Sequence, residues 1–298
     1  MAKIFLTGGS GFIGSWIARY LYKHGHLLTL LLRESSRLDL LEGIEFERIT
    51  GDLSQSISFS GSIDYIIHAG ALVRSHLSWD YYRINTYGTK NVIDLARRLS
   101  VKGFLLLSSI AASGPDGLGH PVSHYGRSKL LAEELVKRSG LSHTIIRLPV
   151  VYGPGDREGS RMFELLKRGV GLLPGGDHRL SLIYVEDVAD FILKIIEERR
   201  FRGETINLSD GKIYHLSDIL RIAGFLMEKK PIMLTLSPGF LSLIVPFLDI
   251  LFKNHSPISR DKVRELLHPG WAFMESYKIS PRFDIEAGLR ETVGSLRE

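Results

Sequence analysis

Residues 3–14 read KIFLTGGSGFIG, and this stretch decides the fold. The run Lys3–Leu6 predicts a buried strand, a glycine-rich turn over Thr7–Gly14 follows it directly, and an apolar helical pattern comes next. Glycines let the backbone approach a phosphate closely, and the N–H groups at a helix start stabilise its negative charge. The stretch therefore predicts the pyrophosphate site of a dinucleotide cofactor. The expected contacts are Gly8, Gly11, Phe12, Ile13 and Gly14.

The composition of the 298-residue chain is that of a globular protein with a full core, at 44% hydrophobic and 24% charged residues. The absence of cysteine excludes disulfides and thiolate nucleophiles, and it is compatible with a cytoplasmic location. No spacing typical of metal ligands is present, so we expect no metal site. The net charge of +5 is spread along the chain, which argues against a nucleic-acid partner. Because the first strand begins within three residues of Met1, no signal peptide is expected.

Strand-like and helical segments alternate through the first half of the chain. Further strands are expected at Leu27–Leu32, Ile44–Ile49, Asp64–His68, Phe104–Ser108 and Thr144–Leu148, with helices over residues 14–24, 78–99 and 126–139. Alternation of this kind, with strands apolar on both faces, predicts an α/β Rossmann fold with a doubly wound parallel sheet. We expect a small C-terminal substrate lobe in addition to this sheet.

Glycine- and proline-rich loops follow Pro149, with helices expected near 187–199, 215–228 and 284–296. We therefore expect residues 1–150 to form mainly the dinucleotide-binding core. Residues 151–298 are expected to form mainly the substrate lobe, with a return to the core at roughly 180–210.

The second strand bears on the choice of cofactor. A carboxylate about twenty residues beyond the glycines would bind the ribose 2′-hydroxyl of NAD, whereas an arginine there suits a 2′-phosphate. Here the strand ends in Arg33, with Arg37 nearby, although Glu34 lies between them. We therefore expect NADP(H) to be preferred over NAD(H). Asp52 and Leu53, just after the third strand, are candidates to contact the adenine, with an ordinary Gly-Asp turn as the alternative.

Three residues in the middle of the chain carry the expected chemistry. Tyr125 and Lys129 are spaced i, i+4, so a helix places both on one face. Ser109 lies at the end of a predicted strand, where active sites of open α/β sheets collect. Tyr125 would exchange a proton with a substrate oxygen while hydride moves to or from a nicotinamide, and Ser109 would orient that oxygen. The positive charges of Lys129 and of the oxidised nicotinamide would both lower the pKa of the phenol. Lys129 would also bind the nicotinamide ribose.

Taken together, the motifs resemble the extended short-chain dehydrogenases/reductases of the NAD-dependent epimerase/dehydratase family. The matching segments, in family order, are Thr7–Gly14, Gly51–Leu53, His68–Ala71, Asn85–Thr89, Ser108–Ser109, Tyr125–Lys129, Arg147–Pro149, Tyr152–Pro154, Tyr184–Ala189 and Ile285–Arg290. The resemblance implies a seven-stranded sheet and gives Ser109, Tyr125 and Lys129 the family's catalytic places. It also implies a cofactor contact at Ala69 and an anchoring role for Asn85. The family's dimer implies a four-helix bundle of the helices around 82–99 and 126–138.

Departures from the family pattern narrow the expected reaction. The family's dehydratases carry an Asp-Glu pair after the catalytic serine, and Ile110–Ala111 replaces it here. Its nucleotide-sugar enzymes place polar diphosphate contacts where this chain has Val150 and Leu180–Leu182. The chain therefore looks closer to the branch that resembles 3β-hydroxysteroid dehydrogenase and dihydroflavonol reductase. Other basic residues still leave phosphate contacts open; these are Arg161, Arg168, His178 and Arg179.

The apolar segment 239–252 is too short to span a bilayer. A helix packed within the small lobe is the favoured interpretation, with a lid over an apolar substrate or a peripheral membrane contact as alternatives.

The sequence thus predicts an NADP(H)-dependent oxidoreductase acting on a secondary alcohol or ketone of a fairly apolar small-molecule substrate. A nucleotide-sugar 4-epimerase with tightly held NAD is the alternative, and a non-catalytic NADP-sensing protein is a remote one.

Overall fold

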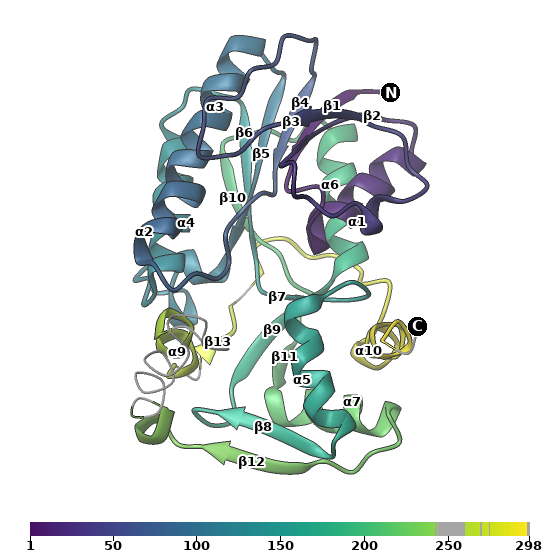
Figure 1. Cartoon of the computed structure of the whole chain (residues 1–298), viewed down its shortest axis with the longest axis vertical. Coiled ribbons are helices and arrows are strands. Elements are labelled where there is room, and N and C mark those ends of the chain that lie inside the picture. Colours follow the sequence, from purple (N-terminus) through teal and green to yellow (C-terminus); the bar gives the residue numbers. More distant parts are fainter. Residues whose placement is uncertain (242, 244–259, 269, 274, 297–298) are drawn as a thin grey trace.

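A seven-stranded parallel sheet forms the upper part of the molecule in Figure 1, with strand order β10-β6-β5-β4-β1-β2-β3. The computed structural model describes residues 1–241, 243, 260–268, 270–273 and 275–296. The strands are β1 (Lys3–Thr7), β2 (Leu27–Leu32), β3 (Glu47–Thr50), β4 (Tyr65–His68), β5 (Gly103–Ser109), β6 (His143–Leu148) and β10 (Glu204–Asn207). The order reverses between β1 and β4, as in a doubly wound Rossmann sheet, and this confirms the predicted fold class.

Helices cover both faces of this sheet (Figure 1). On one face lie α1 (Phe12–Lys23) and α6 (Val185–Glu197); on the other lie α2 (Ser78–Tyr81), the π-helical turn η2 (Tyr82–Tyr87), α3 (Gly88–Leu99) and α4 (His124–Lys137). Side chains of β1 alternate between the two layers, because Ile4 and Leu6 pack with α1 and α6 whereas Phe5 packs with α3 and α4. Both layers are therefore apolar, which accounts for the unbroken apolar runs in the strand sequences.

Two elements of the first half differ from the expectation. The strand expected at Ile44–Ile49 is β3 at Glu47–Thr50, because Ile44 and Phe46 pack their side chains on the core before pairing with β2 begins at Glu47. The helix expected over 78–99 is interrupted by η2, whose side chains bind the Leu72 loop and α4. A wide turn of this kind often marks a functional region.

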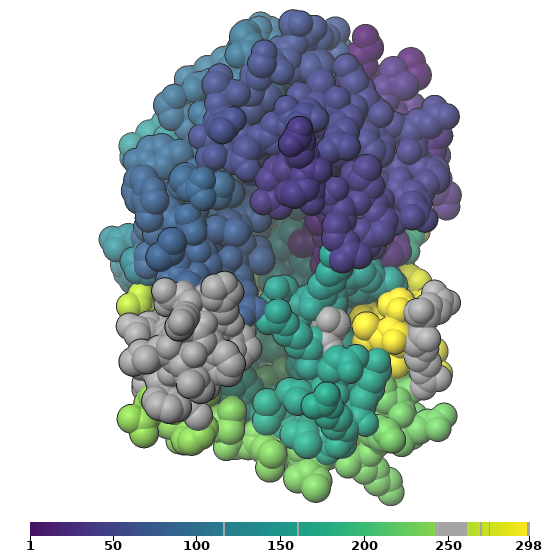
Figure 2. All heavy atoms as spheres, in the orientation of Figure 1, coloured from purple at the N-terminus to yellow at the C-terminus, as the bar shows by residue number. Residues whose placement is uncertain are grey.

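The smaller C-terminal lobe lies at the carboxyl end of the sheet strands (Figure 1). Its elements are β7 (Val150–Tyr152), α5 (Arg157–Lys167), β8 (Val170–Pro174), β9 (Arg179–Tyr184), β11 (Ile213–His215), α7 (Leu216–Leu226), β12 (Ile232–Leu236), α9 (Arg260–Leu266), β13 (Gly270–Trp271) and α10 (Ile285–Gly294). Strand β9 pairs with β7, β11 and β13, and β8 pairs with β12. The sequence reasoning missed these short strands, α5 and α9. Figure 2 shows a recess on one face, between the blue upper part and the teal segment of the lobe.

Segment 239–252 lies mostly outside the described residues. Within it, Leu241 is buried against Val263 of α9, while Phe240 and Leu243 are exposed. Among the helices that the structure describes, none is long and apolar enough to cross a membrane.

Candidate active site

The glycine turn between β1 and α1 is packed so closely that side chains are excluded. Gly8 has a φ of +75°, and a Cβ atom there would lie 2.6 Å from the backbone nitrogen of Gly70. A Cβ atom on Gly14 would overlap the carbonyl oxygen of Gly8. The residue before helix α1 is Gly11, which has no side chain that could cap the helix. The first N–H groups of α1 therefore receive no hydrogen bond from an N-cap side chain. The turn therefore fits a dinucleotide pyrophosphate, with Phe12 and Ile13 in the first turn of the helix.

A buried histidine joins the ends of β1 and β4 below this turn. His68 hydrogen-bonds to Thr7 Oγ1 at 2.7 Å and Thr89 Oγ1 at 2.9 Å, and burial lowers its pKa to about 3. It is therefore neutral and structural. The backbone nitrogen of Ala69 donates to the Thr7 carbonyl at 3.2 Å, and its backbone lies close to Gly8. The cofactor contact expected at Ala69 stays a prediction.

Arg33 follows β2 at the edge where a ribose would lie. Its backbone nitrogen donates to Ser36 Oγ at 3.0 Å, and its carbonyl accepts from Arg48 Nη2 at 3.2 Å. Arg48, which the sequence reasoning missed, pairs in register with Leu30 on the neighbouring strand, so the strand order reveals it. Arg37 is already engaged with Asp39 at 3.2 Å. Of the two predicted phosphate contacts, Arg37 thus has an ion-pair partner, whereas the hydrogen bonds of Arg33 described above are made by its backbone.

Asp52 and Leu53 follow β3, the strand that pairs with β2. Burial acts to raise the pKa of Asp52, but hydrogen bonds from Ser54 and the charge of Arg33 outweigh it, and the net shift is downward. Asp52 is therefore a carboxylate near Arg33. The Leu53 carbonyl accepts from Asn91 Nδ2 of α3 at 2.8 Å, and its side chain lies so near Gly70 that a Cβ atom added there would be 2.9 Å from Leu53 Cδ1.

The three predicted catalytic residues meet at the end of β5. Ser109 is the last residue of the strand, and Tyr125 and Lys129 belong to the first turns of α4. The Ser109 side chain lies close to the phenol of Tyr125 and acts to lower the pKa of that group. Lys129 Nζ donates to the Leu107 carbonyl at 2.7 Å, two residues before Ser109 on the same strand. The helix approaches this strand end because Gly126 carries no side chain, and a Cβ atom there would overlap the Ala111 carbonyl oxygen.

The electrostatics of this cluster differ from the expectation. Burial and the charge of Glu265 raise the pKa of Tyr125 to about 12, against the opposing effect of the Ser109 side chain. Burial also lowers the pKa of Lys129 to about 8, with Glu133 acting in the other direction. The pKa of the phenol is therefore not lowered by Lys129 in the protein alone, because desolvation dominates. Tyr125 is a protonated acid at neutral pH.

A buried carboxylate behind Lys129 joins α4 to two strands. Glu133 accepts from Ser108 Oγ at 2.6 Å and from Arg147 at 2.9 and 2.7 Å, in a bidentate pair. It lies one helical turn after Lys129, so the i, i+4 spacing was the signal that could have found it. Asn85 of η2 has a comparable anchoring role, since its amide binds the Leu72 backbone and Ser128 Oγ.

The residues that stand where nucleotide-sugar enzymes have polar diphosphate contacts, Val150 and Leu180–Leu182, differ in their burial. Val150 is exposed and pairs in register with Leu182, which is buried in the lobe core. Ser181 Oγ accepts from the Phe273 backbone nitrogen. Segment 180–182 therefore belongs to β9, and the Leu182 side chain packs in the core of the lobe. His178, one of the four basic alternatives, is buried and bound to the carbonyls of Pro174 and His268.

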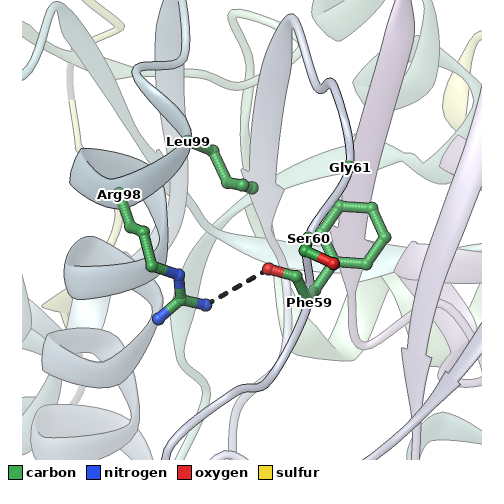
Figure 3. Close-up of a pocket in the computed structure, with 5 residues that line it drawn as sticks. All are labelled: Phe59, Ser60, Gly61, Arg98 and Leu99. Atoms are coloured by element: carbon green, nitrogen blue, oxygen red, sulfur yellow. Dashed lines mark hydrogen bonds between the residues drawn. The ribbon is translucent and has the colours of Figure 1, made fainter.

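Figure 3 shows a separate hollow, lined by Phe59, Ser60, Gly61, Arg98 and Leu99. Arg98 donates across it to the Phe59 carbonyl at 3.4 Å. It lies where α3 ends and before β4 begins, whereas the catalytic cluster lies where β5 ends. Because these strands are parallel, the hollow lies at the amino-terminal ends of the strands, and the catalytic cluster lies at their carboxyl ends.

Comparison with known proteins places this arrangement in a family. The model of the NAD dependent epimerase/dehydratase family matches residues 4–209. The chain belongs to this family. Its relatives include a ceramide reductase of Caulobacter vibrioides, 30% identical over 278 residues that cover 90% of this chain and 85% of the relative. A UDP-glucose 4-epimerase of Vibrio cholerae is 28% identical over 256 residues, which cover 76% of each chain.

A solved structure shares the fold of this family member. The Bordetella bronchiseptica enzyme WbmH, in complex with NAD⁺, superposes with a TM-score of 0.75 at 20% identity and covers 100% of this chain and 99% of that one. With both reductases and epimerases among its relatives, the chain is an NAD(P)-dependent oxidoreductase or epimerase of the extended short-chain dehydrogenase type.

Proposed function

We propose that this family member is an NADP(H)-dependent oxidoreductase that reduces a ketone, or oxidises the corresponding secondary alcohol, on a fairly apolar small molecule. The observation that carries the proposal is the meeting of Ser109, Tyr125 and Lys129 at the end of β5. The glycine turn, at the end of the nearby strand β1, is shaped for a dinucleotide.

The roles of the three residues follow from their contacts. When bound, the reduced nicotinamide supplies a hydride to the carbonyl carbon. Tyr125 Oη gives its proton to the carbonyl oxygen, and it is protonated for that task because burial keeps its pKa at about 12. Ser109, whose side chain lies close to the phenol, orients the same oxygen. Lys129 is held at the Leu107 carbonyl, where it can also donate to the ribose hydroxyls of a bound cofactor.

The preference for NADP(H) rests on Arg33. Two arginines, Arg33 and Arg48, converge at the strand edge, and Arg37 would have to leave its ion pair with Asp39 to assist them. A charge-assisted contact to a 2′-phosphate contributes roughly 1.5–3 kcal/mol, or one to two orders of magnitude in affinity. Fluorescence titration of NADPH and NADH tests this. Equal affinities, or an NADH preference that Arg33→Ala leaves unchanged, would contradict it.

The apolar substrate is supported by the surroundings of β7 and β9. Val150, which is exposed, occupies a place where a nucleotide diphosphate would need a donor, and His178 is engaged elsewhere. A buried charge without partners costs several kcal/mol, whereas apolar surface gains roughly 25 cal/mol per Å² on burial. The ceramide reductase relative is consistent with such a substrate. A thermal-shift panel of apolar ketones, β-keto compounds and UDP-, GDP- and dTDP-sugars, with turnover of the hits, tests the substrate class.

A nucleotide-sugar 4-epimerase is the second candidate, which the Vibrio cholerae relative favours. An epimerase would use the same three residues to oxidise and re-reduce one carbon, with a cofactor that it does not release. The decisive measurement is the mass of any ligand released from the purified protein by denaturation. Retained NAD(H), with epimerisation of a nucleotide sugar and no net reduction, would replace the reductase proposal.

We also propose a homodimer through α3 and α4. These helices lie side by side on one face of the sheet (Figure 1), and the adjoining residues Leu77, Trp79 and Tyr87 are exposed apolar side chains. Clustered exposed apolar residues mark interaction surfaces more often than solitary ones do. The cytoplasmic location stays a prediction from the sequence.

A further inference from the structure

Helix α9 of the C-terminal lobe binds the first turn of the helix that carries Tyr125. The carboxylate of Asp261 accepts two backbone hydrogen bonds there, from His124 at 2.7 Å and from Tyr125 itself at 3.0 Å. One turn further along α9, Glu265 accepts from Ser123 Oγ at 2.8 Å. Figure 1 shows α9 below the start of α4.

These contacts satisfy groups that α4 cannot satisfy alone. The first N–H groups of a helix have no partner inside it, and they carry partial positive charge. Ser123 caps only Gly126, with its Oγ accepting at 2.9 Å, and the first turn of α4 contains no acidic residue. Asp261 therefore supplies, from more than 130 residues away, the acceptors that this turn lacks.

Both carboxylates are fixed in place. Asp261 and Glu265 are each 8% exposed, so water competes little for their hydrogen bonds. Lys262 Nζ donates to the second oxygen of Glu265 at 2.9 Å, and Trp271 Nε1 donates to the Glu265 backbone carbonyl at 2.8 Å. Contacts within the lobe thus fix the position of α9, and the two carboxylates of α9 in turn fix the start of α4.

We propose that Asp261 and Glu265 are positioning residues, which hold the backbone of Tyr125 and the cap of its helix in the geometry that proton transfer to the substrate requires. The proposal rests on the proposed role of Tyr125 as proton donor. It makes the substrate lobe part of the catalytic apparatus, since the orientation of the phenol depends on a helix of that lobe.

The geometry has an electrostatic consequence that can be measured. Three groups act on the Tyr125 phenol from the elements around it: Glu265 from α9 and Tyr81 from α2 raise its pKa, and Ser109 from β5 lowers it. Glu265→Gln removes a negative charge, so the phenolate becomes less unfavourable and the pKa of Tyr125 falls. Ketone reduction requires the protonated phenol. The rate of reduction therefore begins to decline at a lower pH in this variant than in the wild-type enzyme.

The test compares Asp261→Asn and Glu265→Gln with the wild-type enzyme in NADPH-dependent ketone reduction. We expect Asp261→Asn to lower kcat about tenfold or more, because small displacements of a catalytic group have large effects on rate. The Kd of NADPH stays within about twofold, since neither carboxylate contacts the glycine turn. Asp261→Glu, which keeps the charge, restores part of kcat.

Asp284→Asn is the matched control. Asp284 caps α10 of the same lobe, where its Oδ1 accepts from the Ala287 backbone nitrogen at 2.8 Å, and it has no hydrogen bond to α4. Asp284→Asn removes a carboxylate charge at the start of another helix of the lobe and keeps the Oδ1 acceptor, so it reports the effect of losing such a charge away from α4. Equal losses of kcat in Asp261→Asn and Asp284→Asn, or a pH profile unchanged by Glu265→Gln, would overturn the proposal.

A readout without turnover separates this proposal from the proposed function. Hydrogen exchange of the His124 and Tyr125 amides should accelerate in Asp261→Asn and stay unchanged in Asp284→Asn. If the wild type reduces no carbonyl but the amides behave in this way, the proposed function fails while the structural coupling holds. Unchanged exchange in Asp261→Asn would reject the coupling itself.

Discussion

The hydroxyl of Tyr125 is the reacting group of the proposed enzyme, and its environment favours the protonated form. Tyr125→Phe removes that hydroxyl and keeps the ring, which packs against Tyr81 with centroids 6.1 Å apart. We expect turnover to fall by about 10²–10⁴-fold, the usual contribution of acid–base assistance. The fold and the Kd of NADPH should change little. Steady-state kinetics with circular dichroism check this, and substantial activity in the variant would show that another residue is the acid.

The same pKa predicts opposite pH dependences for the two directions of the reaction. Reduction uses the protonated phenol, so titration of Tyr125 should not change kcat between about pH 6 and about pH 9, well below its pKa of about 12. Oxidation uses the phenolate, and its rate should rise by about tenfold per pH unit until the pKa in the ternary complex is reached. Because the positive charge of oxidised nicotinamide favours the phenolate, that plateau should lie below the pKa of the protein alone. A reduction rate that falls steadily from pH 6 would contradict the assignment.

At the residue scale, the spacing of Tyr125 and Lys129 was sufficient to predict that they share a helix face. Their partners were not predictable. The Leu107 carbonyl that binds Lys129 lies on a strand, and the depth of burial that shifts both pKa values depends on how α4 packs. Asp261 gave no signal at all, because an acidic residue far along the chain has no pattern that ties it to another helix.

Among the elements, α4 depends on a glycine for its place beside η3 (Ile110–Ala112). Gly126→Ala would force a methyl group into the Ala111 carbonyl, so the helix must shift. We expect a loss of about 1–3 kcal/mol in stability and about tenfold in kcat, because Tyr125 moves with the helix. Gly294→Ala is a suitable comparison, since a Cβ atom there meets nothing within 4 Å. Thermal unfolding and kinetics of both variants provide the test; equal effects would argue against a specific contact.

Strands buried on both faces were predictable as elements. The strands β1, β2, β4, β5 and β6 are short segments rich in apolar residues, and the structure confirms them. Three of the lobe strands, β7, β11 and β13, were not found because they have only two or three residues and pair across long separations. Short strands carry too few positions for a periodic pattern, so only tertiary pairing defines them.

At the scale of the whole molecule, the proposed dimer can be tested at one residue. Trp79 is 60% exposed and lies 5.7 Å from Tyr87, ring centroid to ring centroid. Trp79→Glu places a charge in this apolar patch and should convert the dimer to a monomer in light scattering after gel filtration. Phe225→Glu, at an apolar side chain of α7 that is even more exposed, should leave the dimer intact. A wild-type monomer, or loss of the dimer only in the second variant, would place the interface elsewhere.

The seventh strand of the sheet has a consequence for synthesis of the chain. Strand β10 pairs with β6, but residues 149–203, which include β7, β8, β9 and α6, leave the ribosome between them. Throughout that interval, β6 has one edge without a partner, and an unpaired apolar strand edge is a template for association with other chains. Chains form such contacts most readily while they are incomplete. The period of greatest risk for this protein therefore falls while its substrate lobe is being made, and it ends when Glu204–Asn207 emerge and complete the sheet.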